Sequence, residues 1–190
     1  MSEKEKMLNG ENYNSRDPEL LEQYHAARAL LKHYNNLDSR NLEERRSTLQ
    51  SLLEYCGDGV WIETPFLCDY GEHISIGDNT FVNANCIFID NNKITIGKNG
   101  LIGPHVQVYT AEHPLKASER IVKTEHGTHY LTSTKPVSIG DNVWIGGNSI
   151  IFPGVTIGNN VTIGAGSVVT KSISDNVLAF GNPCKIQREL

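Results

Sequence analysis

An aliphatic residue recurs at every sixth position from Ile139 to Val169 without a slip. The intermediate positions 145, 151, 157 and 163 are all isoleucine, and glycine follows four of the five isoleucines. A period of six matches neither the period of an α-helix, about 3.6 residues, nor the two-residue alternation of a flat strand. It predicts triangular coils with a corner every six residues, stacked into a parallel β-helix. Glycine would supply either a small side chain or a positive φ at the corner.

The same phase extends toward the N-terminus with interruptions. It starts weakly at Ile62, slips by two residues before Ile76, slips by two again before Ile96, and stops after Val108. Residues 110–135 have no such pattern, so we expect one long loop there, and loops of this length are usually functional. We therefore expect a helical segment at 1–57, a β-helix at 58–172 and a tail at 173–190 with a turn at 181–183. The flat sides of such a prism would suit a trimer.

Two amphipathic helices are expected before the repeats. Asp17 and Pro18 are typical of a helix start, and Asn35 would end the helix. Its apolar face comprises Leu20, Tyr24, Ala27, Leu31 and Tyr34. A second helix is expected at about 41–55 with Gly57 as its C-cap. Its buried leucines would be Leu42, Leu49, Leu52 and Leu53. The pair could cover an open end of the prism or border an active site.

Composition limits the partners and the compartment. The 190 residues carry a net charge of −5, which argues against nucleic acid or an anionic membrane as the main partner. The charged start at Met1 is followed by no apolar segment, and no run reaches transmembrane length. The cysteines form no Cys-x-x-Cys pair, so we expect reduced thiols in a cytoplasmic protein. They are Cys56, Cys68, Cys86 and Cys184.

Short motifs follow one another in order along nearly the whole chain after the helices. They are Asp69-Tyr70-Gly71, Asn83-Ala84-Asn85, Thr110-Ala-Glu-His113-Pro114, Asn142-Val-Trp144-Ile-Gly146, Pro153-Gly-Val-Thr-Ile-Gly158, Gly164-Ala-Gly-Ser-Val-Val-Thr-Lys171 and Gly181-Asn-Pro-Cys-Lys185. This set resembles the hexapeptide-repeat acyltransferases, in particular the maltose and galactoside O-acetyltransferases. The resemblance implies a mainly β fold, a left-handed parallel β-helix, and a homotrimer with active sites between subunits. It also implies transfer of an acetyl group from acetyl-CoA to a sugar hydroxyl.

The transfer requires a base for the hydroxyl and a donor for the oxyanion formed at the thioester. Histidine is the natural base because its pKa lies near neutrality. His113, at the mouth of the loop, corresponds to the catalytic base of the family. By the same resemblance, Asn83 contacts the acceptor hydroxyl, and the backbone N–H of Gly147 binds the thioester oxygen. No cysteine matches a nucleophile position, so we expect direct attack by the hydroxyl.

The resemblance also gives a set of acetyl-CoA contacts. Trp144 would flank the pantetheine arm, and Ala165 would leave room beside it. Positive charge for the phosphates would come from Lys171, Lys185 and Arg188, with Thr170 at the end of the last coil. No metal ion is expected.

The residues expected to bind the acceptor differ from those of the galactoside enzymes. Ser15 and Asn91 stand where those enzymes have carboxylates that bind sugar hydroxyls, and Asp69 stands at a serine position. Asp90 and Asp17 are close enough in sequence to substitute. Because carboxylates accept hydroxyl hydrogens better than serine or asparagine does, a galactoside acceptor is in doubt. Maltose, glucose or another small hydroxyl compound remains open.

Three other functions compete with O-acetyl transfer. An N-acetyl or antibiotic-modifying acyltransferase of the same fold could use the same histidine. A zinc hydratase would need three converging histidines, and only His105 and His113 are candidates for zinc ligands. His73, His126 and His129 occur in no comparable motif. A non-catalytic scaffold would not need the complete set of motif residues.

Overall fold

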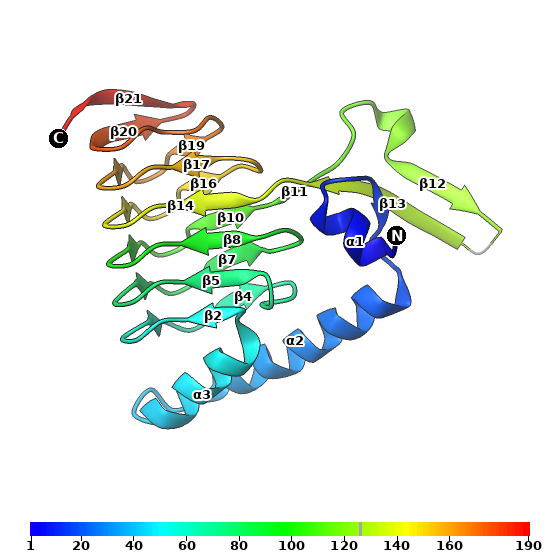
Figure 1. The fold of residues 1–190 in the computed structure, drawn as a ribbon, viewed down its shortest axis with the longest axis horizontal. Helices are drawn as coiled ribbons and strands as arrows, with labels where there is room; N and C mark the ends of the chain where they lie inside the picture. Colours follow the sequence, from blue (N-terminus) through cyan, green and yellow to red (C-terminus); the bar gives the residue numbers. More distant parts are fainter. Residues whose placement is uncertain (126) are drawn as a thin grey trace.

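The computed structural model describes residues 1–125 and 127–190, so His126 lies outside the described residues. The chain folds into a left-handed parallel β-helix of about six turns with helices at its N-terminal end (Figure 1). The fold predicted from the six-residue period is therefore confirmed. Within the described residues, no helix is long and apolar enough to cross a membrane.

The coils stack into three sheets, here called faces 1, 2 and 3, whose solenoid strands pair in parallel. Face 1 contains β2 (Tyr55–Cys56), β5 (Ile74–Ile76), β8 (Ile94–Ile96), β14 (Val137–Ile139) and β17 (Thr156–Ile157). Face 2 contains β3 (Trp61–Ile62), β6 (Phe81–Val82), β9 (Leu101–Ile102), β15 (Trp144–Ile145), β18 (Thr162–Ile163), β20 (Val177–Gly181) and β21 (Cys184–Glu189). Face 3 contains β4 (Phe66–Cys68), β7 (Cys86–Ile89), β10 (Gln107–Tyr109), β16 (Ile150–Ile151) and β19 (Val168–Val169).

Inward side chains stack in register along each face. On face 2, Ile62 pairs with Val82 and Val82 with Ile102, while Ile145 pairs with both Ile102 and Ile163. All five residues are at most 1% exposed. The six-residue period therefore reports the inward position of each face, where burial of branched aliphatic side chains stabilises the coil.

The corner between faces 1 and 2 explains the Gly-Asp-Asn sequences of the repeat. Positive φ angles there belong to asparagines such as Asn99 (56°) and Asn142 (56°), and to Gly59 (69°) in the first coil, while the glycines that directly follow the inward residues have none. Asn99 Nδ2 donates to Asn142 Oδ1 at 3.0 Å, and Asn142 Nδ2 donates to Asn160 Oδ1 at 2.9 Å. At Gly140, a Cβ would lie 2.6 Å from Asn159 Oδ1, so this glycine provides space. Of the two roles proposed for glycine, only the small side chain applies to the glycines that directly follow the inward residues.

The corner between faces 3 and 1 contains all the interruptions of the repeat. The interval from face 3 to face 1 is eight residues between Cys68 and Ile76, and eight again between Phe88 and Ile96. In the next coil the strand on face 3 ends at Tyr109, and the following strand on face 1 begins only at Val137. The two slips and the long loop are therefore successive extensions of one corner.

The long loop is ordered by strands, which its sequence did not reveal. It contains β11 (Ala111–Glu112), a 3-10 helix η1 (Ala117–Glu119), β12 (Ile121–Thr124) and β13 (Gly127–Thr134). We call these elements the arm, which projects sideways from the stack (Figure 1). β13 pairs antiparallel with β11, with β12 and with β1 (Tyr13–Asn14), so the N-terminal segment fastens the arm to the body.

Helices α2 (Pro18–Asn36) and α3 (Leu42–Leu52) lie across the first coil, while the shorter α1 (Glu3–Leu8) lies beside β13 (Figure 1). The predicted start of α2 is confirmed, because Asp17 accepts the N–H of Glu19. The second helix ends earlier than predicted, at Leu52 with Leu53 as its C-cap. Gly57 is not its C-cap: its N–H donates to Ile76 O in the next coil. Leu42 is 59% exposed, so its predicted burial was wrong.

The C-terminal segment continues the fold beyond the point where the six-residue pattern ends. β20 pairs in parallel with β18, and β21 folds back antiparallel on β20. The coil register thus extends past Lys171 into the segment expected to be a tail. The turn predicted at residues 181–183 joins these two strands.

Candidate active site

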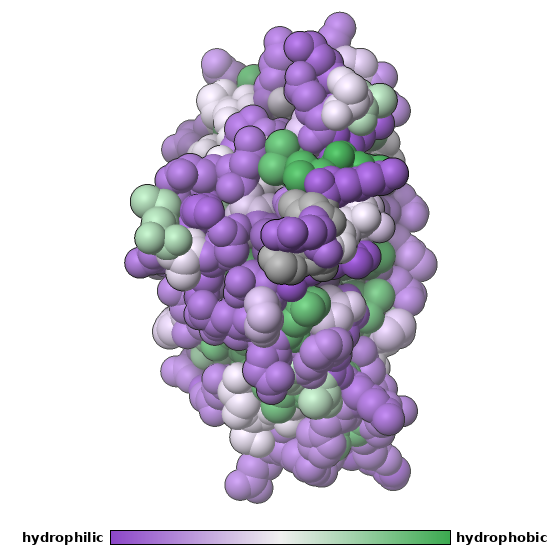
Figure 2. All heavy atoms as spheres, turned by 90° about the vertical axis from the view of Figure 1, so that its right-hand side faces the viewer, coloured by the Kyte–Doolittle hydropathy of each residue, from purple (hydrophilic) through white to green (hydrophobic). Residues whose placement is uncertain are grey.

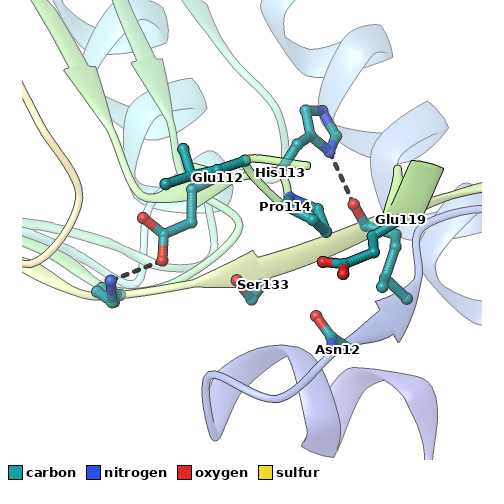
Figure 3. A pocket seen from close by; sticks show the side chains of 9 residues that line it. Asn12, Glu112, His113, Pro114, Glu119 and Ser133 are labelled. Carbon is teal, nitrogen blue, oxygen red and sulfur yellow. Dashed lines mark hydrogen bonds and ion pairs between the residues drawn. The ribbon is translucent and has the colours of Figure 1, made fainter. Parts of the chain in front are cut away.

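His113 follows β11 directly, at the point where the arm leaves the corner between faces 3 and 1. Its Nδ1 lies 2.8 Å from the carbonyl oxygen of Leu131 on β13 (Figure 3). Because a carbonyl oxygen can only accept a hydrogen bond, Nδ1 must carry the proton. The other nitrogen, Nε2, is then a free acceptor in the neutral ring. This is the tautomer that a general base requires.

A cavity of about 530 Å³ opens beside His113. Its lining residues come from the N-terminal segment, β11, β13 and the arm: Asn12, Glu112, His113, Pro114, Leu115, Glu119, Leu131, Ser133 and Lys135. Figure 3 shows the Glu112 and His113 side chains pointing in different directions. Glu112 forms an ion pair of 2.6 Å with Lys135. Glu112 is thus paired with Lys135, and among the described residues a backbone carbonyl orients the His113 ring.

A second cavity, of about 260 Å³, brings together Asp69 and Asn91, two of the three residues predicted to bind the acceptor, but not Asn83. Ser15, Asp69 and Asn91 line it together with Arg16, Leu20, Leu21, Tyr24 and Tyr70. Asp69 and Asn91 meet because each occupies the corner between faces 3 and 1, in adjacent coils. Ser15 reaches them from the segment between β1 and α2. We call this cavity the acceptor pocket.

Asp69 is held by an arginine that sequence reasoning missed. Its Oδ1 lies 3.3 Å from Nη2 of Arg28 on α2, and that guanidinium lies 4.7 Å from the ring centroid of Tyr24. Burial raises the pKa of Asp69 to about 6, with a further contribution from Asp90, while Arg28 acts in the opposite direction. Arg28 follows Tyr24 by one helical turn, so a helical projection of residues 17–36 could have indicated this pair.

The two aspartates considered as substitutes have other roles. Asp17 caps α2, as described above. Asp90 is fully buried and does not line the acceptor pocket among the described residues. Its Oδ1 accepts the backbone N–H groups of Asp69 and Tyr70, each at 2.9 Å. Asp90 therefore does not replace a missing sugar-binding carboxylate by direct contact.

Most candidates for the acetyl-CoA site lie on face 2 or at its corner with face 3. Trp144 on β15 is 55% exposed, and its Cα pairs with Thr162, which pairs with Leu178, which pairs with Arg188 on β21. Gly147 and Ala165 occupy the adjoining corner, where Gly166 N–H donates to Gly147 O. Lys185 pairs with Phe180 at the top of the same edge. These candidates thus lie on face 2 and along its adjoining corner with face 3.

Glycines keep that corner narrow. A Cβ at Gly103 would lie 2.5 Å from the backbone nitrogen of Gly147, and one at Gly146 would lie 2.4 Å from that of Ala165. Either contact would force the coils apart. Glycine at these positions therefore allows the coils to stack closely at this corner.

Asn83 belongs to the same corner as Gly147, two coils lower. Its N–H donates to Ile102 O, as Gly103 N–H donates to Ile145 O one coil above. His113, Asp69, Asn91, Thr170 and Lys171 all lie at the other end of face 3. The structure gives no contact between Asn83 and His113 among its described residues. The candidates therefore form two groups at two corners of the prism.

Histidines outside the motif have structural positions. His105 is a corner residue with a φ of 59° and an exposed side chain. His73 is buried, with Nδ1 2.7 Å from the carbonyl oxygen of Asp90. In the part of the chain that the structure describes, no group of three or more His, Cys, Asp or Glu side chains could hold a metal ion.

Comparisons with known proteins agree with this architecture. A family model described as "Hexapeptide repeat of succinyl-transferase" matches residues 136–171, and one described as "Maltose acetyltransferase hexapeptide capping motif" matches residues 6–57. Nodulation protein L of Rhizobium meliloti (strain 1021) is 46% identical over 186 residues, which cover 98% of each chain.

Solved structures of acetyltransferases also match this chain. The crystal structure of a maltose O-acetyltransferase from Clostridium difficile 630 has a TM-score of 0.93 at 45% identity, covering 100% of this chain and 98% of that one. A hexapeptide-repeat acetyltransferase of Vibrio cholerae O1 biovar eltor, complexed with acetyl coenzyme A, has a TM-score of 0.89 at 38% identity, covering 100% and 99%.

The protein is by class a left-handed β-helix acyltransferase. This follows from the repeats, from the arm that leaves one corner and from these matches. The capping motif and the relatives narrow the class further. The chain belongs to the hexapeptide-repeat family of acetyl-CoA-dependent O-acetyltransferases that includes the maltose and galactoside enzymes.

Proposed function

We propose that this protein transfers the acetyl group of acetyl-CoA to a hydroxyl group of a sugar, with His113 as the general base. The observation that carries the proposal is the 2.8 Å hydrogen bond from His113 Nδ1 to Leu131 O. It leaves Nε2 unprotonated and able to take the hydroxyl proton. The relationship to a maltose O-acetyltransferase supports a sugar as the acceptor.

In the proposed step, the acceptor hydroxyl oxygen attacks the thioester carbonyl carbon while its proton moves to His113 Nε2. The negative charge on the carbonyl oxygen is stabilised by the backbone N–H of Gly147, with the amide of Asn83 positioning the attacking hydroxyl. Collapse of the intermediate breaks the carbon–sulfur bond. The leaving thiolate takes the proton back from His113, so the products are the acetyl ester and free CoA thiol.

The acceptor pocket supports the binding of a polyhydroxyl compound. The Asp69 carboxylate accepts hydroxyl hydrogens, and the Asn91 amide and Ser15 hydroxyl can both donate and accept. The aromatic ring of Tyr24 provides an apolar surface beside them. The pocket offers one carboxylate among its described lining residues, so we propose a neutral sugar acceptor.

For acetyl-CoA, we propose that the pantetheine arm runs along the corner of Gly147 and Ala165 beside the exposed ring of Trp144. The phosphates would then lie near the top of the stack. There Lys185 and Arg188 on β21 supply positive charge, and Thr170 and Lys171 of a neighbouring copy would complete the site.

A homotrimer would join the two groups of candidates. Face 3 lies between the two corners that carry them, and its outward row is mostly apolar: Leu67, Ile87, Gln107, Ile150 and Val168. The outward row of face 1 is mostly serine and threonine: Tyr55, Ser75, Thr95, Ser138 and Thr156. In three copies that turn face 3 toward a common axis, the corner that carries Asn83 in one copy would lie beside the corner that carries His113 in the next. This arrangement supports active sites shared between copies.

The first test measures release of CoA thiol from acetyl-CoA with a panel of sugars and amines. His113→Ala should lower the sugar-stimulated rate by about 10²–10⁴-fold, which is the usual cost of losing a general base. His129→Ala is the matched control, because it removes a second histidine from the same arm and should leave the rate unchanged. Stimulation by amines alone would reject the sugar acceptor. An unchanged rate in His113→Ala would reject the assigned base.

A further inference from the structure

We propose that Asp90 is a positioning residue of the acceptor site: its buried side chain fixes the backbone of Asp69 and Tyr70 in the coil below. This inference rests on the proposed acetyl transfer to a sugar. Asp90 lies between β7 and β8, at the corner where the repeat is widened by two residues. It is 0% exposed, and Oδ1 accepts two backbone N–H groups at 2.9 Å.

Burying a carboxylate to accept two N–H groups costs free energy, because the charged group loses its contact with water. Burial raises the pKa of Asp90, which reflects the cost of holding its charge away from water. Oδ2 has no hydrogen-bond partner among the described residues. His73 also faces this group, with Nδ1 2.7 Å from the Asp90 carbonyl oxygen. Its buried Nε2 lies 3.7 Å from Glu72 Oε1 and has no hydrogen-bond partner among the described residues.

The same fold closes comparable corners without a buried charge. One coil above, at the same corner, the neutral hydroxyl of Thr110 accepts Asn92 N–H at 2.9 Å. At the corner between faces 1 and 2, the exposed Asp78 accepts Asp58 N–H at 2.8 Å. The coil therefore does not require a buried aspartate at position 90. This corner differs from the other two because the N–H groups that its aspartate accepts belong to two residues of the acceptor pocket.

The Asp90 contacts join both coils that form the pocket. The two N–H groups belong to Asp69 and Tyr70, and the residue after Asp90 is Asn91, which lines the same cavity. Fixing the Asp69 backbone defines where its carboxylate meets Arg28, 3.3 Å away. Asp90 thus sets the spacing between two sugar-binding side chains without touching the sugar.

The negative charge of Asp90 has a second, separable effect. It raises the pKa of Asp69 in addition to the effect of burial, while Arg28 opposes both. Among the described residues, the other titratable groups that interact with Asp69 include the buried hydroxyls of Tyr13 and Tyr70 and the buried thiol of Cys68. Replacing Asp90 with asparagine keeps an oxygen acceptor for the N–H groups and removes the charge. The pH at which acceptor binding weakens should then move downward.

The test compares Asp90→Ala, Asp90→Asn and wild type by steady-state thiol release, with KM measured separately for the sugar and for acetyl-CoA. Asp90→Ala should raise the KM of the sugar about tenfold and leave that of acetyl-CoA within about twofold. Asp90→Asn should recover most of the sugar KM and shift its acidic limb to lower pH. Asp78→Ala is the matched control, because it removes a comparable cap at a corner without a pocket.

The outcomes separate this inference from the proposed function. If wild type releases no thiol in response to any acceptor, the proposed function fails and the role of Asp90 fails with it. If wild type is active but Asp90→Ala has the sugar KM of wild type, the positioning role alone is overturned. The role is also overturned if Asp90→Ala raises both KM values equally, as general destabilisation would. If the alanine variant does not fold, the pH profile of Asp90→Asn supplies the result, because a profile identical to that of wild type would overturn the effect of Asp90 on Asp69.

Discussion

At the scale of single residues, the acceptor pocket depends on a carboxylate whose ionisation is finely balanced. The pKa of Asp69, about 6, lies above its ordinary value of 3.8 because the group is buried. Only the ionised form accepts hydrogen bonds at both oxygens from sugar hydroxyls. Because burial raises its pKa, Asp69 changes its charge within the pH range in which enzymes work.

The expected consequence is a loss of sugar affinity at low pH. As pH falls from 7 to 5, Asp69 gains a proton and the KM of the sugar should rise about tenfold. In Asp69→Asn, the KM should be high throughout and nearly independent of pH. Measuring KM for the sugar at several pH values checks this, with the KM of acetyl-CoA as internal reference. A wild-type profile that is flat between pH 5 and 7 would contradict it.

At the scale of elements, helices α2 and α3 cover the open end of the β-helix and satisfy its exposed carbonyl groups. The first coil has no strand below it, so its downward-pointing carbonyl groups need partners outside the β-helix. Tyr34 OH donates to Ile62 O at 2.6 Å, and Arg45 Nη2 donates to the same oxygen at 2.7 Å. Asn35 Nδ2 donates to Phe66 O at 2.9 Å. The helical pair thus closes the prism and, through Tyr24, also borders the acceptor pocket.

Arg45 should be the most costly polar residue of this cap to remove. It is 4% exposed, and its guanidinium lies 4.7 Å from the Tyr34 ring centroid and 4.9 Å from that of Trp61. Arg45→Ala should reduce the free energy of unfolding by about 2–4 kcal/mol, because it leaves buried acceptors with weaker partners and opens a cavity. Denaturant unfolding at fixed protein concentration measures this. Arg40→Ala, in an exposed ion pair with Asp38, should change stability by less than about 0.5 kcal/mol.

At the scale of the whole molecule, the two corners of face 3 carry different parts of the proposed chemistry. His113, Asp69 and Asn91 lie at one corner, while Asn83 and Gly147 lie at the other. A single prism keeps these groups apart because the three strands of a coil hold its corners at fixed separation. Assembly of copies is therefore the step that would complete the site.

Mixing two inactive variants tests this directly. Trimers assembled at random from equal amounts of His113→Ala and Asn83→Ala chains should recover about a quarter of wild-type activity, because one contact in four joins an intact His113 to an intact Asn83. Thiol release is measured on co-expressed variants that carry different purification tags. If both residues act within one chain, no chain in the mixture is intact and the rate should stay at that of the single variants.

The sequence by itself determined the fold, because the inward position of a β-helix is a local property that returns every six residues. It also determined where α2 begins, since Asp17 and Pro18 act on the adjacent turn, and where along the chain the six-residue pattern is interrupted by the arm. Only the tertiary structure decided the remaining features. The Leu131 carbonyl that orients His113 is a backbone group, and its direction depends on the pairing of β11 with β13. Asp90 and Arg28 reach the acceptor pocket across coils and across a helix, so their partners lie far away in the chain, at a distance set by packing and not by spacing in sequence.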